Sequence, residues 1–453
     1  MDVQVQRTFV IPAPASEPSA EVPLTVFDLV APTYHVTVLF AYTAPNPTNA
    51  ALLDALAATL PRFPLLTARL VAGAGHRRRR PFFVTGKGGA GALVVEATVP
   101  SALSDHLPLA PAPELASLHV PVPAPPPQHL LMLQINRFAC GGLVVATSAH
   151  HQAADGYSMS TFFHAWADAV RATNNNTGGG LLPPPAPYGP SAIVPRRPPR
   201  CEFEHRGTEF LRAEDAAAGK PAPVRVDPSE IANVLLHLPS EFVAGLKQAA
   251  ATAPQQMMSR PPYTTFETVS AHLWRKITLA RGRADDASRT ALNAAVNGRA
   301  RLAGADEAVA RGFFGNVVLT ASAATSARDL ARGTLGDAAA LVRAGVRARD
   351  RHYFQSFIDF GELHGGEELE PTVGDDDNVL LPDVASDSWL HLELHRLDFG
   401  CGGRLAGILP AKVPLDGVVV LIPSLRKGGG VDVFVALWEK HAKELMNIAY
   451  TMD

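Results

Sequence analysis

Cysteine is scarce in this chain of 453 residues, which has only Cys140, Cys201 and Cys401. So odd and sparse a set argues against a disulfide framework and favours a reducing compartment. Long apolar runs are missing as well, because no stretch reaches the about 18 residues that span a bilayer. The first residues also lack the apolar centre of a signal peptide. We therefore expect a cytoplasmic protein that does not bind to a membrane.

An excess of charge of one sign is lacking too. The formal net charge is -3, and charged residues make up only 18% of the chain. The one dense basic block, residues 77–80, is short and lies near glycines, which indicates a solvated hairpin tip. This composition does not suggest a nucleic-acid partner. The hydrophobic content of 47% is that of a globular protein with a sizeable core.

Strand-like and helix-like segments are mixed in both halves of the chain. Hydrophobic patterning predicts strands at residues 3–11, 34–42, 93–99, 130–138, 143–149, 231–238, 291–296, 317–321, 389–397, 405–408, 418–422 and 431–437. It predicts helices at residues 49–60, 160–172, 241–250, 264–280, 330–349 and 438–450. Runs of asparagine, glycine and proline between positions 174 and 200 are typical of a linker. We predict an α/β protein with mixed α and β elements, in which domains at 1–195 and 227–453 are joined by a crossover linker at 196–226.

One polar stretch, His-His-Gln-Ala-Ala-Asp-Gly at residues 150–156, interrupts this pattern. Counted from His151 it is His-x-x-x-Asp-Gly, with an apolar run before it and an amphipathic run after it. A histidine held between a buried strand and a helix can accept a proton near neutral pH. Asp155 and Gly156 suit a sharp turn. The same residues also fit a satisfied core histidine beside a turn, so the motif alone leaves both interpretations open.

A metal site made of His150, His151 and Asp155, together with His164, is a further interpretation. Adjacent residues in a strand point to opposite faces, so the two neighbouring histidines do not readily bind one ion. The spacing disfavours this interpretation, and we expect no metal site.

A second unusual stretch is Asp-Phe-Gly-Cys-Gly-Gly at residues 398–403. Its three glycines indicate backbone in a special conformation or in close approach to a neighbour. A phosphate-binding loop would follow a strand and open a helix, whereas another predicted strand follows here. The stretch is therefore interpreted as a tight turn between strands.

Taken together, His151-x-x-x-Asp155-Gly156 and Asp398-Phe399-Gly400-x-Gly402 resemble the paired signature of the plant BAHD acyl-CoA-dependent acyltransferases. Further blocks similar to that family lie at residues 24–28, 137–142, 272–275, 297–302, 315–316 and 421–424. Residues 205–210, 356–360 and 387–390 resemble the grass branch that makes hydroxycinnamoyl amides of agmatine, putrescine or tryptamine.

The resemblance implies two domains of the chloramphenicol-acetyltransferase type, with the active-site channel between them. It implies that His151 is the general base and that Asp155 pairs with Arg299. Acyl-CoA would be a co-substrate, and no permanently bound cofactor is implied. The residues with an implied structural role are Asp155, Gly156, Arg299, Asp398, Gly400 and Gly402.

The sequence departs from the family pattern at three places. Cys401 stands where most members have tryptophan, and Gly403-Arg404 replaces a basic-proline pair, although the amide-forming branch also relaxes this motif. His391 stands where shikimate-accepting members have an arginine that holds the acceptor carboxylate. A histidine cannot match the bidentate grip of a guanidinium, and Glu393, expected on the same strand face, could attract a cation.

We therefore predict transfer of an aromatic acyl group, such as p-coumaroyl or feruloyl, from CoA to an amine such as agmatine, putrescine or tryptamine. The alternative is transfer to an alcohol such as shikimate or quinate. A non-catalytic small-molecule-binding protein stays a further alternative, and a condensation domain is disfavoured because the chain has no room for a carrier domain. The residues predicted to bind the acceptor are His35, Thr37, His391 and Glu393, and those predicted to bind CoA are Thr264 and Thr265. We expect a monomer with small-molecule substrates only.

Overall fold

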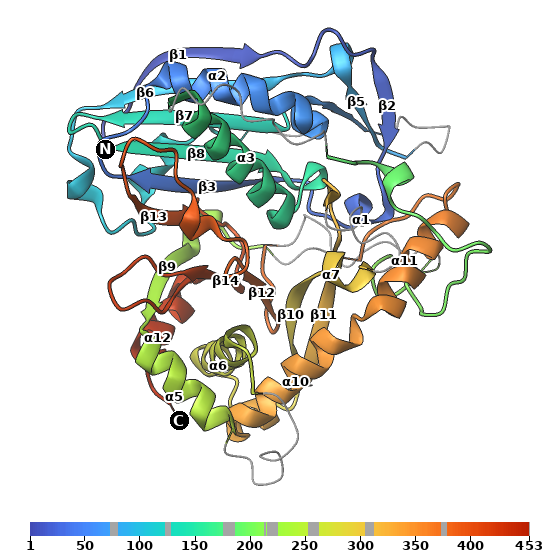
Figure 1. Cartoon of the computed structure of the whole chain (residues 1–453). Coiled ribbons are helices and arrows are strands. Elements are labelled where there is room, and N and C mark those ends of the chain that lie inside the picture. The colour runs from blue at the N-terminus through green and yellow to red at the C-terminus, as the bar shows by residue number, and fades with distance from the viewer. Residues whose placement is uncertain are drawn as a thin grey trace.

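The computed structural model describes residues 1–72, 80–122, 128–174, 186–212, 214, 225–251, 262–303, 312–372 and 378–452. Most of the basic block at 77–80 and parts of the predicted linker lie outside these ranges. Figure 1 shows two halves stacked on each other, each built on a sheet with helices packed against it. The predicted fold class, mixed α/β with two sheet-containing domains, is confirmed.

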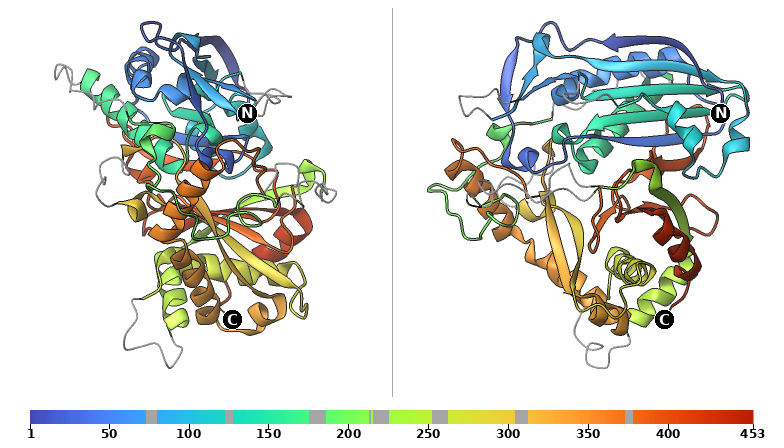
Figure 2. Two further views of the ribbon diagram at one scale, coloured as in Figure 1. Left: turned by 90° about the vertical axis from the view of Figure 1, so that its right-hand side faces the viewer. Right: turned by 180° about the vertical axis from the view of Figure 1, so that it is seen from behind.

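The first sheet has the strand order β1-β6-β7-β8-β3-β13. Its strands are β1 (Gln4–Ile11), β6 (Ala92–Val99), β7 (Leu131–Phe138), β8 (Leu143–His150), β3 (His35–Tyr42) and β13 (Leu405–Pro410). Two long helices, α2 (Asn49–Thr59) and α3 (Gly156–Asn174), lie together on one face of it (Figures 1 and 2). Every residue of β8 is buried, which explains its mostly apolar sequence and gives His151 a rigid support.

The second sheet has the order β11-β10-β12-β14-β15-β9. Its strands are β11 (Val318–Ser326), β10 (Arg289–Asn297), β12 (Val384–Ser388), β14 (Val418–Pro423), β15 (Val431–Trp438) and β9 (Ile231–Leu238). The helices packed around it include α5 (Ser240–Ala251), α6 (Thr265–Ala280), α9 (Ala327–Arg332), α10 (Leu335–Ala348) and α12 (Glu439–Ile448). Thr264 and Glu267 form the capping box that the sequence predicts at the start of α6.

Short elements and one further helix lie around the junction of the two halves. They are α1 (Val26–Leu29), α7 (Arg299–Leu302) and α11 (Arg351–Leu363), together with a small sheet of β2 (Ala20–Pro23), β5 (Phe82–Thr85) and β4 (Arg69–Val71). Helix α11 packs against both α1 and α7. The described part of the predicted linker also packs on α11, where the ring of buried His205 bonds Ser356 at 3.1 Å.

The second half of the chain contributes one strand to the first sheet. Strand β13 comes from the part of the chain predicted as the second domain, 227–453, yet it pairs antiparallel with β3 in the first sheet, with Ile408 opposite Phe40. Local patterning predicts that residues 405–408 form a strand, but it does not tell which sheet the strand joins. The first sheet is therefore complete only when the second half of the chain has folded onto it.

Two predicted elements are wrong. The strand at residues 389–397 is absent, because β12 ends at Ser388 and a turn and a short 3-10 helix (Leu394–Arg396) follow. Of the alternating leucines there, Leu390 and Leu392 are half-buried and Leu394 is buried, through packing of an irregular segment rather than in a sheet. The helix at 330–349 is split into α9 and α10, since Thr334 starts a new helix as its N-cap. No helix among the described residues is long and apolar enough to cross a bilayer.

Candidate active site

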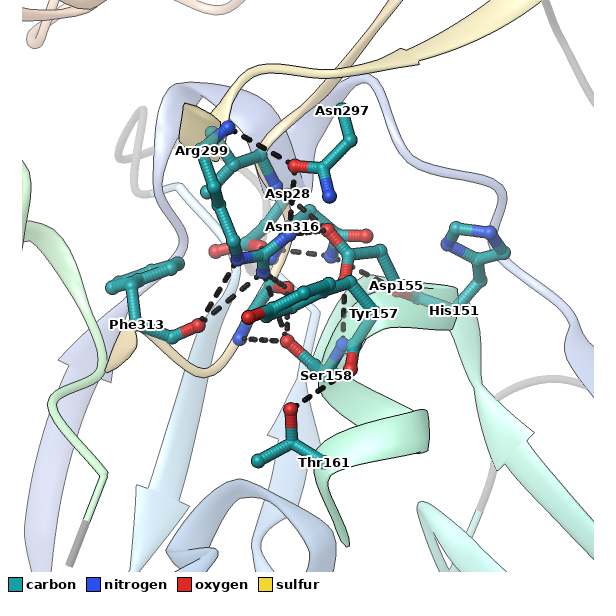
Figure 3. A network of polar contacts seen from close by, with 12 residues as sticks. Asp28, His151, Asp155, Tyr157, Ser158, Thr161, Asn297, Arg299, Phe313 and Asn316 are labelled. Carbon is teal, nitrogen blue, oxygen red and sulfur yellow. Dashed lines mark hydrogen bonds and ion pairs between the residues drawn. The ribbon is translucent and has the colours of Figure 1, made fainter. Parts of the chain in front are cut away.

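His151 stands where β8 ends and the chain turns toward α3. Its backbone N–H donates to the carbonyl of Tyr34 at 3.0 Å, which ties the turn to the start of β3. The imidazole is half-buried, and its buried Nδ1 has no hydrogen-bond partner among the described residues. Figure 3 shows the ring pointing away from a dense polar network that surrounds Asp155. The polar network therefore lies on one side of the ring, and the opposite edge of the ring stays available for a reacting group.

His150 points elsewhere and has a different environment. Its Nε2 lies 2.9 Å from the carbonyl of Thr33, and its ring packs edge-on against His35 at 5.1 Å between centroids. Burial lowers the pKa of His150 to about 4, so the ring is neutral at neutral pH. His150 and His151 are thus adjacent in the sequence but contact different parts of the structure. Among the described residues no group of three or more potential ligands could hold a metal ion.

His35 and Thr37 lie on β3, inside the first domain. A ring nitrogen of His35 bonds the carbonyl of His129 at 2.9 Å, and the hydroxyl of Thr37 bonds that of Ser148 at 2.7 Å. Both side chains are buried. Acceptor binding by these two residues stays a prediction, while the bonds given above are made within the domain. Alternation along a strand identified their common face but not the fact that this face is interior.

Asp155 and Arg299 form a buried ion pair across the two halves, with 2.7 Å between Oδ2 and Nη1. The two side chains are only 1% and 2% exposed. The carboxylate also accepts the backbone N–H groups of Ser158, at 2.9 Å, and Val317, at 3.0 Å. Both carboxylate oxygens of Asp155 are therefore hydrogen-bonded within the protein, so this residue fixes the turn after His151.

The Arg299 guanidinium extends this network. Its Nη2 donates to the carbonyl of Gly315 and to the hydroxyl of Ser158, both at 2.9 Å, while Tyr157 stacks on it with 4.7 Å from Cζ to the ring centroid (Figure 3). Ser158 and Tyr157 open helix α3, and Gly315 belongs to the second half. The arginine thus locks the start of α3 to the second half of the chain.

The segment after β12 brings a third set of side chains to the junction. Asp387 is exposed, yet nearby protein desolvates its carboxyl enough to raise its pKa, and the charge of His151 opposes this rise. Asp387 is therefore within electrostatic range of the imidazole. Its carboxylate accepts the indole N–H of Trp389 at 3.2 Å. No chemical pattern in the sequence singled out Asp387.

The predicted placement of Glu393 is wrong. Glu393 is not in a strand with His391: its φ of 52° is left-handed, and its carboxylate pairs with Arg396 at 2.8 Å on the surface. His391 is exposed on the same irregular segment. This segment docks on α3, where the hydroxyl of Ser160 donates to the carbonyl of Leu392. A side chain at Gly156 would meet Leu392 at 3.2 Å, so glycine permits this close approach.

The Asp-Phe-Gly segment forms a tight turn that leads into β13. Asp398 accepts the N–H of Gly400 at 2.7 Å, and Gly400 and Gly402 have φ of 83° and 87°. Phe399 is buried against Trp166, with 4.9 Å between ring centroids. The turn meets the Tyr42 end of β3, whereas His151 lies at the opposite end, about 23 Å away along an eight-residue strand. Its role is therefore structural.

Thr264 and Thr265 lie at the start of α6. The hydroxyl of Thr264 accepts the N–H of Glu267 at 3.1 Å, and the Glu267 carboxylate bonds Arg343 at 2.7 Å. The Thr-x-x-Glu pattern at the start of α6 is therefore explained by capping of the helix. Binding of CoA by the two threonines stays a prediction.

Comparison with known proteins identifies the family. A model of the Transferase family matches residues 1–452. The chain belongs to this family, the BAHD acyltransferases. Tryptamine hydroxycinnamoyltransferase 2 of Oryza sativa subsp. japonica is 37% identical, covering 95% of this chain and 93% of its own. Agmatine coumaroyltransferase-1 of Hordeum vulgare is 36% identical, covering 95% and 94%. The predicted family and its amide-forming branch are thus confirmed.

Solved structures support the fold of this BAHD family member. Vinorine synthase matches with a TM-score of 0.67 and 18% identity, covering 98% of this chain and 96% of its own. TRI101 of F. sporotrichioides, complexed with Coenzyme A and T-2, matches with a TM-score of 0.69 and 15% identity, covering 94% and 97%. At such low sequence identity, the similarity to these two structures supports the fold alone.

Proposed function

We propose that this BAHD enzyme transfers an aromatic acyl group from an acyl-CoA thioester to an amine and so forms an amide, with His151 as general base. The observation that carries the proposal is the half-buried imidazole of His151, free of hydrogen bonds to the described residues and fixed from behind by the Asp155–Arg299 pair. The names of relatives at 33–37% identity, which act on tryptamine, agmatine or putrescine, support the amine acceptor.

The chemistry needs no further nucleophile. The amine nitrogen attacks the thioester carbonyl while the imidazole removes a proton from it, and the C–N bond forms. The C–S bond then breaks, and the CoA thiolate leaves and can take the proton back from the imidazolium. Both sides of the junction come from one chain, so the mechanism does not require a second copy.

The acceptor is tested by comparing turnover of p-coumaroyl-CoA with agmatine, putrescine, tryptamine, shikimate and quinate. We expect the amines to be the better acceptors. An aliphatic ammonium has a pKa near that of lysine, about 10.4, and only the free base attacks, so the rate should rise from neutral toward alkaline pH. If shikimate or quinate is the best acceptor and the amines are inert, the O-acylation alternative replaces this proposal.

Asp387 supports a cationic acceptor, because an exposed carboxylate close to His151 can attract an ammonium group. We expect Asp387→Asn to lower kcat/KM for agmatine by roughly tenfold, since an ion pair in a partly desolvated place is worth more than in bulk water. The matched control is Glu393→Gln, whose carboxylate pairs with Arg396 at the surface. Equal kcat/KM in the two variants would remove Asp387 from the proposed site.

A further inference from the structure

Asp28 is a buried carboxylate without an ion pair among the described residues. It belongs to α1 and is 2% exposed. One oxygen accepts the N–H and the hydroxyl of Thr25, at 2.8 and 2.7 Å. The other accepts the side-chain and backbone N–H groups of Asn316, at 2.9 and 3.3 Å. Burial of an unpaired carboxylate is costly, and here desolvation raises its pKa to about 6.

Asn316 connects this carboxylate to the peptide groups at the candidate base. Its Nδ2 lies within hydrogen-bond distance of three acceptors, namely the carboxylate of Asp28, the carbonyl of His151 at 2.9 Å and the carbonyl of Gln152 at 3.0 Å. Gln152 in turn donates from its side chain to the carbonyl of Asp28 at 3.2 Å. These contacts join α1, the turn at His151 and the loop before β11 (Figure 3).

The orientation of the Asn316 amide follows from the charge of Asp28. Its Oδ1 is buried without a hydrogen-bond partner among the described residues, while its Nδ2 faces three oxygens. A flipped amide would put Oδ1 against a carboxylate and two carbonyls, and electrostatic repulsion excludes that arrangement. The carboxylate therefore reinforces the orientation in which Nδ2 donates, and the two N–H groups of the amide serve these three acceptors, one of the N–H groups being shared.

We propose that Asp28 and Asn316 are positioning residues for His151: the buried carboxylate orients the asparagine amide, which holds the carbonyl groups of His151 and Gln152 and so sets where the imidazole stands. This inference rests on the proposed role of His151 as general base. The positioning role explains why the carboxylate of Asp28 is buried, although the helix that carries it has only four residues, Val26–Leu29. The capping box of that helix would not need the second carboxylate oxygen.

The test compares Asn316→Asp, Asp28→Asn and the exchanged pair Asp28→Asn/Asn316→Asp. In Asn316→Asp the ionised side chain cannot donate to the two carbonyl groups, and two carboxylates face each other. We expect kcat at saturating substrates to fall on the order of 10²-fold, as displacement of a catalytic group by about 1 Å can cause, with KM for acyl-CoA little changed. Asp28→Asn should lower kcat less, because Asn316 can still donate.

The exchanged pair separates positioning from stability. The amide placed at position 28 can donate to the carboxylate placed at position 316, so Tm should recover toward the wild-type value. The value of kcat should nevertheless stay low, because the carbonyl of His151 still lacks its donor. Recovery of kcat together with Tm would overturn the proposal. His151→Ala is measured in parallel: if it keeps its activity, the general-base role fails, and if it is inactive while Asn316→Asp keeps its kcat, only the positioning role fails.

A second buried aspartate provides a matched control. Asp416 is 1% exposed and accepts from Arg281 at 2.6 Å and from the N–H of Trp438 at 2.8 Å. Asp416→Asn should lower Tm without lowering kcat at a temperature where the protein is folded. Should Asn316→Asp fail to fold, Asp28→Asn decides the question against this control. Equal kcat in the two Asp→Asn variants would then overturn the proposal.

Discussion

His151→Ala should abolish acyl transfer while the protein stays folded. Loss of a general base costs on the order of 10²–10⁴-fold in rate. The fold should tolerate the change, because the imidazole is half-buried and makes no hydrogen bond to the described residues, so its removal leaves no buried partner unsatisfied. Steady-state turnover with p-coumaroyl-CoA and agmatine, together with Tm, measures both effects. Near-wild-type turnover would exclude His151 as the base.

The neighbouring histidine provides the matched control. His150 is 1% exposed and bonds the carbonyl of Thr33, so His150→Ala removes packing and leaves a buried acceptor unpaired. We expect a lower Tm but retained turnover per folded molecule. Both substitutions are His→Ala, so they remove the same side chain. Different outcomes at the two adjacent positions would therefore distinguish an imidazole that takes part in the reaction from one that only supports the fold.

The sequence identifies the histidine proposed as general base better than it identifies what surrounds it. His151 and Asp155 lie four residues apart, and their pattern is visible in a short window. Arg299 lies 144 residues beyond Asp155, and only the family resemblance linked the two. The partnership of Asp28 and Asn316, separated by 288 residues, had no signal in spacing, although Thr25-x-x-Asp28 fits a capping box. Contacts between distant segments are decided by tertiary packing.

The wrong predictions have a common physical cause. Alternation at residues 389–397 indicated a strand, yet Leu394 and Leu397 are buried because an irregular segment packs against its neighbours. Glu393 was assigned a strand face on that basis, and its left-handed backbone and its pair with Arg396 contradict it. Hydrophobic periodicity reports which residues are buried, and it cannot tell a sheet from a docked loop when the segment is short.

Removing either side of the Asp155–Arg299 pair should be strongly destabilising. Arg299→Ala leaves a carboxylate buried without its cation, and Asp155→Ala leaves a guanidinium in the same state. Loss of one partner of a buried ion pair costs about 3–5 kcal/mol. Because the pair lies directly behind His151, each variant should also lower kcat by moving the imidazole. Denaturant unfolding and turnover of each purified variant measure the two effects.

The double variant and an exposed pair make this test quantitative. Asp155→Ala/Arg299→Ala should be destabilised by less than the sum of the single variants, because no buried charge is left without a partner. Arg332 and Asp285 form a pair whose side chains are 68% and 84% exposed, so Arg332→Ala should change the free energy of unfolding by less than about 1 kcal/mol. If Arg299→Ala behaves like Arg332→Ala in stability and leaves the rate untouched, the ion pair does not hold the turn at His151, and the imidazole must be positioned by the remaining contacts of the turn, those with Tyr34 and Asn316.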